Sequence, residues 1–215
     1  MSYTGVWSVG AVPDAEVVAL PRRFAHLDET WTVPDGCAED LRWWLGGGDR
    51  EPYFTPEPTP AAHRFAAFAR GGGPTAPAVA AMKDAATGLL RHAAAAAEGS
   101  DPDALFAVAV RKGEPATALH HGLGAEASAQ LPGWFGDFLL TADEVRAVLP
   151  GAESVLAVTG HRRTEVLARV DSWAYAMTDA PEGEFDAAGL LAGPLRVLRY
   201  AAGRGLGVVA VTETY

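Results

Sequence analysis

Two apolar segments at opposite ends of the chain decide the fold: Tyr3–Val12, whose body reads TGVWSVGAV, and Leu206–Thr214, which reads LGVVAVTET. The first places Val and Trp among small residues and the second is rich in valine and threonine, so both are predicted to be strands. An isolated strand leaves its amide and carbonyl groups without hydrogen bonds. We therefore expect the two segments to pair, which ties both ends of the chain into one core.

Helical patterns dominate the chain between these strands. The strongest is the alanine-rich segment 78–97, because alanine has the highest helix propensity. A second helix at 37–45 ends at a triple glycine, and Thr141 with Glu144 forms a capping box that begins another. The remaining predicted helices lie at 14–20, 61–69, 101–110, 141–149, 164–177 and 194–202, and segment 154–159 fits either a strand or a helix.

Prolines and glycines mark the irregular segments. A Pro-rich surface loop is predicted at 49–60, a Gly-rich joint at 71–77 and a long irregular connection at 113–136. A connection of that length is uncommon in a compact domain unless it carries function. The predicted fold is α+β: a mostly helical single domain over 1–215, with a small sheet that pairs the N-terminal and C-terminal strands.

Composition narrows the class of partner and the compartment. Seventeen basic and 27 acidic residues give a net charge of -10, which disfavours binding to nucleic acid. The single cysteine, Cys37, excludes an intramolecular disulfide and fits a reducing compartment. No apolar run is long enough to span a membrane. We expect a soluble, cytoplasmic protein that binds neither nucleic acid nor membrane.

Histidines and acids supply the candidate catalytic residues. Imidazole is the usual general base near neutral pH, which draws attention to the adjacent His120 and His121. Glu126, in the same 114–137 region, and His161 complete the candidate set. The competing interpretation is an ordinary exposed or packed histidine pair. Neither the His-Glu-x-x-His nor the Cys-x-x-Cys spacing occurs, so no metal and no cofactor is predicted.

Aromatic residues supply the candidate binding site. Trp43, Trp44, Trp134 and Phe135, together with Asp137, are predicted to line it, because binding pockets are rich in aromatic side chains. Neighbouring aromatics on a helix point in different directions, so one of Trp43 and Trp44 is expected in the core and the other partly exposed. Packing in the core is the competing explanation for the whole set.

Four runs of residues also point to a family. They are 27–31 (LDETW), 41–47 (LRWWLGG), 138–145 (FLLTADEV) and 195–203 (LRVLRYAAG), the last leading into the terminal strand. Their order resembles that of the YfbM-like bacterial proteins of unknown function, in which a Leu-Asp-x-x-Trp run, a Leu-Thr-x-x-Glu-Val helix start and a final helix–strand pair occur. The present chain departs from the pattern at 34–37 and in its alanine-rich middle. The resemblance implies an α+β fold and no activity.

Two functional hypotheses follow from these patterns. The first is a non-catalytic binding or regulatory protein, in its specific form one that neutralises a basic protein partner. The second is a small enzyme of specialised metabolism that uses the histidine and acidic residues of the 114–137 region. The partner is accordingly either a protein or a small molecule, and the sequence leaves the oligomeric state open.

Overall fold

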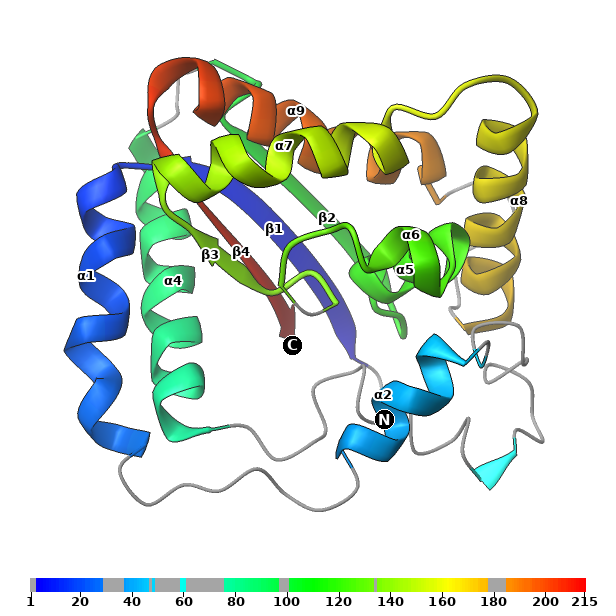
Figure 1. Cartoon of the computed structure of the whole chain (residues 1–215), viewed down its shortest axis with the longest axis horizontal. Helices are drawn as coiled ribbons and strands as arrows, with labels where there is room; N and C mark the ends of the chain where they lie inside the picture. Colours follow the sequence, from blue (N-terminus) through cyan, green and yellow to red (C-terminus); the bar gives the residue numbers. More distant parts are fainter. Residues whose placement is uncertain are drawn as a thin grey trace.

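A four-stranded antiparallel sheet forms the centre of the structure (Figure 1). The computed structural model describes residues 3–28, 37–46, 48, 59–60, 76–96, 101–133, 135–177 and 185–215. The strands are β1 (Thr4–Val12), β2 (Leu105–Arg111), β3 (Phe138–Leu140) and β4 (Gly207–Thr214), in the order β2-β1-β4-β3. β1 pairs with β4 from Gly5 opposite Thr214 to Val12 opposite Gly207. The predicted α+β fold and the pairing of the two terminal strands are confirmed.

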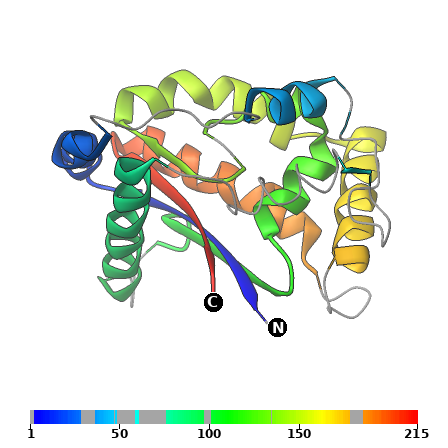
Figure 2. The same cartoon turned by 90° about the horizontal axis from the view of Figure 1, so that it is seen from below.

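Helices cover both faces of this sheet, as Figures 1 and 2 show. On one face lie α1 (Asp14–Phe24) and α4 (Pro77–Ala96), with a short 3-10 helix at Ala25–Asp28. On the other face lie α5 (Pro115–Leu123), α7 (Ala142–Leu156) and α9 (Ala187–Arg204). The same layer also contains α2 (Cys37–Leu45), α6 (Ala125–Ser128) and α8 (Gly160–Met177). Among the helices that the structure describes, none has the length and apolar character needed to cross a membrane.

The alternation of side chains along the central strands divides the core in two. Trp7 and Val9 of β1 face the layer that contains α5, α7 and α9, together with Ala210 of β4. Val209 and Val211 of β4 face α1 and α4. Successive residues of a strand point to opposite faces, so both terminal strands are buried on both sides.

The prediction of a helix that begins at Asp101 is wrong, because residues 105–111 form strand β2. Oδ1 of Asp101 accepts a hydrogen bond from the backbone N–H of Asp103 at 3.1 Å, which makes a turn and not a helical cap. Leu105–Arg111 then pairs along its whole length with β1. Pairing with a central strand therefore outweighs the helical start signal of the Asp-Pro dipeptide.

The prediction of a long irregular connection at 113–136 is also wrong, because this segment contains α5 and α6. Pro115 occupies the first position of α5, where a missing amide hydrogen costs nothing. Every residue of α5 is buried. The glycine-rich and alanine-rich composition that resembles a loop is what allows this helix to pack closely on its neighbours, since Gly122 approaches the side chain of Val170 on α8.

Three helices differ from prediction at prolines. α1 continues through Pro21. α7 continues through Pro150, so segment 154–156 is helical. α9 begins seven residues before Pro194. An internal proline costs about 3 kcal/mol in an isolated helix. Burial of the residues that follow Pro150 offsets that cost in α7, and Asp186 caps α9 by accepting the N–H of Gly189 at 2.7 Å.

The remaining predicted elements are confirmed, differ from the structure, or lie outside the described residues. The helix at 37–45, the long alanine-rich helix and the Thr141–Glu144 capping box are confirmed. β3 was not among the predicted strands, and α8 begins at Gly160, four residues earlier than expected. The helix predicted at 61–69, and most of the Pro-rich loop and the Gly-rich joint, lie outside the described residues.

Candidate binding site

The candidate catalytic histidines of α5 lie in the core. His120 and His121 are 6% and 7% exposed. Burial disfavours the charged imidazolium and lowers the pKa of His120 to about 4, so this ring is neutral at pH 7. The ring centroid of His120 lies 4.7 Å from that of Phe135. His120 is therefore a neutral side chain packed against an aromatic ring.

The other two candidate catalytic residues lie at the surface. Glu126 is exposed on α6. His161 is exposed near the beginning of α8, where its Nε2 lies 3.0 Å from Oε1 of Glu165. The four candidates thus divide between core and surface. Within the described ranges, no group of three or more His, Cys, Asp or Glu side chains could hold a metal ion.

The aromatic candidates also belong mostly to the core. Trp44 and Phe135 are 3% and 5% exposed, and their ring centroids are 5.6 Å apart in an edge-on contact. Trp43 is partly buried, which confirms that one of the two neighbouring tryptophans packs in the core and the other is partly exposed. Trp134 lies outside the described residues. Core packing explains Trp44 and Phe135.

Asp137, the remaining candidate, is held by a tight turn before β3. Gly136 has a φ of +96°, and its carbonyl oxygen accepts a hydrogen bond from Nε1 of Trp7 at 2.9 Å. A Cβ at this position would lie 2.5 Å from the Cβ of Ala116, so both the backbone conformation and the space require glycine. The turn places Asp137 at the point where β3 begins.

The carboxylate of Asp137 closes part of the edge of β4. Its Oδ1 accepts hydrogen bonds from the backbone N–H and the hydroxyl of Thr212, at 2.6 and 2.9 Å. Its Oδ2 accepts from Nζ of Lys83 on α4 at 2.8 Å, and Lys83 also donates to Oγ1 of Thr212 at 3.0 Å. Because β3 pairs only with residues 208–210 of β4, this side chain takes the place of the next strand residue.

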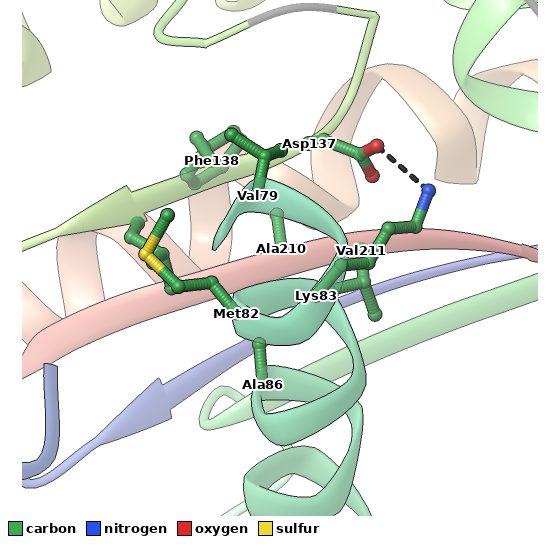
Figure 3. Close-up of a pocket in the computed structure, with 9 residues that line it drawn as sticks. Val79, Met82, Lys83, Ala86, Asp137, Phe138, Ala210 and Val211 are labelled. Carbon is green, nitrogen blue, oxygen red and sulfur yellow. Dashed lines mark hydrogen bonds and ion pairs between the residues drawn. The ribbon is translucent and has the colours of Figure 1, made fainter. Parts of the chain in front are cut away.

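A cavity of about 190 Å³ lies beside this network, between α4 and the strands β3 and β4 (Figure 3). We call it the edge pocket. Its helical wall follows the spacing i, i+3, i+4, i+7, which places four side chains on one face of α4. The lining residues are Val79, Met82, Lys83 and Ala86 on α4, Asp137, Phe138 and Leu139 at β3, and Ala210 and Val211 on β4.

The edge pocket is apolar except at one end. Lys83 and Asp137 form its charged end, and their side chains are 31% and 39% exposed. Val79, at the rim of the edge pocket, is 47% exposed, so its side chain is accessible to a partner. The arrangement can hold an apolar group in the pocket while a polar group meets the Lys83–Asp137 pair.

Of the nine residues that line the edge pocket, Asp137 is the one that was named from the sequence as a candidate binding residue. The spacing of Val79, Met82, Lys83 and Ala86 was the available signal for the helical wall. Nothing in the sequence indicates that this face of α4 lies across the end of β3, since residues 83 and 137 are brought together only by the fold. Comparison of the chain with protein-family models, with curated proteins and with solved structures finds no match.

Proposed function

We propose that this protein is a non-catalytic binding protein whose edge pocket receives an apolar side chain of a protein partner. The volume of the edge pocket is the observation that carries the proposal. Pockets for small molecules usually enclose about 300–1,000 Å³, whereas this cavity encloses about 190 Å³. That volume suits one large apolar side chain, such as leucine or phenylalanine, better than a substrate with room for catalytic groups.

The chemistry of the pocket also supports binding over catalysis. Its two charged groups are engaged with each other, and Asp137 accepts three hydrogen bonds, two from Thr212 of β4 and one from Lys83 of α4. A carboxylate used in this way is a structural acceptor and a poor general base. The second hypothesis, a small enzyme, requires a base beside the pocket. The imidazole of His120 is buried, and its lowered pKa of about 4 makes it a weak base, while the exposed Glu126 and His161 are not among the residues that line the edge pocket.

The charge of the chain supports a basic partner. The described ranges carry 18 acidic and 14 basic residues, a net charge of -4, so the other -6 of the net charge of -10 comes from residues outside those ranges. An acidic surplus attracts a basic protein over a distance of about 8–10 Å at physiological salt. We infer a basic partner that carries an exposed apolar residue, and we expect its affinity to fall as salt is raised.

Nuclear magnetic resonance with a model side chain tests the pocket. The probe is N-acetyl-leucine methylamide, and N-acetyl-glycine methylamide, which lacks the side chain, is the matched control. We expect saturable shift changes at Val79, Met82, Ala210 and Val211 with the leucine probe, little change with the glycine probe, and loss of the effect in Val79→Asp. Absence of saturable shifts at these residues, or shifts centred on Trp44 and His120, would overturn the proposal.

A further inference from the structure

Strand β2 lies at one margin of the sheet, with β1 as its neighbour. The backbone N–H of Lys112 donates to the carbonyl of Tyr3 at 2.9 Å. At the other end, the N–H of Ala11 donates to the carbonyl of Ala104 at 2.9 Å. The even-numbered residues of β2 therefore direct their backbone groups toward β1. Because these groups alternate along an antiparallel strand, the odd-numbered residues 105–109 direct theirs outward. We call this outward row the open edge.

The two margins of the sheet are built differently. At the β3 margin the strand has three residues, and the side chain of Asp137 covers β4 beyond it. β2 is seven residues long, and segment 105–110 contains neither proline nor a charged residue. Ala107 and Ala109 are exposed on the same face. Proteins usually protect edge strands with prolines, charges or short lengths, so the open edge has the character of a pairing surface.

We propose that two copies of this chain pair through the open edge, with the two β2 strands antiparallel and centred on Val108. This register places Ala107 opposite the partner's Ala109, and Leu105 opposite the partner's Arg111. Each of these pairs joins two odd-numbered residues, so the outward N–H and C=O groups of Ala107 and Ala109 meet outward groups of the partner. The result is one continuous sheet through both molecules, closed by a two-fold axis.

A second copy fits this edge for two reasons. A strand that runs antiparallel to itself matches every outward group without a second sequence, and the small side chains of Ala107 and Ala109 leave room for the approach. The charges at its ends are also complementary. Asp101 and Asp103 precede β2, and Arg111 and Lys112 lie at its other end. Antiparallel pairing brings the acidic start of one strand beside the basic end of the other.

The acidic start remains accessible to such a partner. Asp101 lies 3.1 Å from Arg204, and Asp103 lies 3.3 Å from Arg196, both arginines belonging to α9. The side chains of Asp101 and Asp103 are nevertheless 37% and 52% exposed. The net charge of -10 on each copy opposes association, so the dimer is expected to strengthen as salt is raised.

Sedimentation equilibrium with a charge-exchange pair of variants tests this register. Ala107→Lys with Ala109→Lys places like charges opposite each other in the dimer, whereas Ala107→Lys with Ala109→Glu places opposite charges there. We expect the average mass of the wild-type chain to rise with concentration toward twice that of one chain. The double-lysine variant should require at least tenfold more protein for the same rise, and the lysine–glutamate variant should not. Ala80→Lys with Ala147→Lys, at exposed helical alanines, is the control for added charge.

Amide hydrogen exchange gives a readout that needs no substitution. Exchange at the N–H groups of Ala107 and Ala109 should slow as protein concentration rises, while exchange at Thr214, on another strand, should not change. A wild-type chain that stays monomeric to millimolar concentration contradicts the proposal. So does a dimer that the double-lysine variant leaves unchanged, or an assembly that grows beyond two chains.

Discussion

Asp137 shows how one side chain can complete a sheet. It lies two residues beyond a buried aromatic, Phe135, and its carboxylate binds the backbone of Thr212 and the ammonium group of Lys83. These contacts join β4 to α4 at the charged end of the edge pocket. Hydrogen bonds to a charged group are stronger than neutral ones, and partial exposure of both side chains reduces that advantage. These contacts hold the rim of the pocket in place.

His120 gives a prediction at the same scale, in the pH dependence of stability. Burial lowers its pKa to about 4, whereas a histidine in an unfolded chain has a pKa of about 6.5. Between these values the unfolded chain binds more protons, so acid favours unfolding. This residue alone should reduce the free energy of unfolding by about 2 kcal/mol between pH 7 and pH 5. Urea denaturation of the wild type and of His120→Gln at both pH values measures the difference.

The control for that experiment is His161→Gln, which removes an imidazole at the exposed surface and so separates the effect of the buried ring from the loss of any histidine. Titration of the His120 ring by nuclear magnetic resonance gives the pKa directly and does not depend on a variant that folds. Parallel stability curves for the wild type and His120→Gln, or a measured pKa near 6.5, would show that the ring is not buried as described.

At the scale of the element, the turn before β3 positions the edge pocket. Gly136→Ala would force a positive φ on alanine and bring its Cβ within 2.5 Å of Ala116. We expect a loss of about 1–3 kcal/mol from the backbone conformation alone, with a further loss from the clash. Gly88→Ala is the opposite case, since Gly88 lies within α4 and no atom of the described residues is within 4 Å of an added Cβ. It should gain about 0.5–1 kcal/mol. Thermal unfolding of both variants tests the account, and equal effects would contradict it.

Local signals identified some elements and failed for others, for physical reasons. The capping box at Thr141 and the alanine-rich α4 are determined by nearby residues, and both were predicted. β2 was predicted as a helix because its identity depends on pairing with β1, about 100 residues earlier in the chain. Pro150 was predicted to end α7, but packing of the following turn in the core outweighs the local cost.

The candidate site shows the same limit. Asp137 was among the candidate residues named from the sequence, but its hydrogen-bond partners were not, because Lys83 and Thr212 lie 54 and 75 residues away in the sequence. Of the aromatic residues named with it, Trp44 and Phe135 pack in the core, Trp43 is partly buried against the core, and Trp134 lies outside the described residues. A pocket between a helix and the edge of a sheet depends on three separate segments. The spacing of residues within one segment therefore cannot predict such a pocket.

At the scale of the whole molecule, the pairing of β1 with β4 joins the two ends of the chain at the centre of the sheet. α4 packs over these strands, and its register against them sets the edge pocket. The resemblance to the YfbM-like proteins stays a prediction, and it carries no activity to this chain. The proposed function therefore rests on the edge pocket and on the net negative charge of the chain.

Paired affinity purification from the native host tests the central claim most directly. The wild-type chain is compared with Val79→Asp, which places a charge at the rim of the edge pocket, and with Ala80→Asp, which places the same charge on the next, exposed residue of α4. We predict a basic protein retained equally by the wild type and Ala80→Asp, and at least tenfold less by Val79→Asp. If every retained protein binds the two variants equally, the edge pocket is not the binding site.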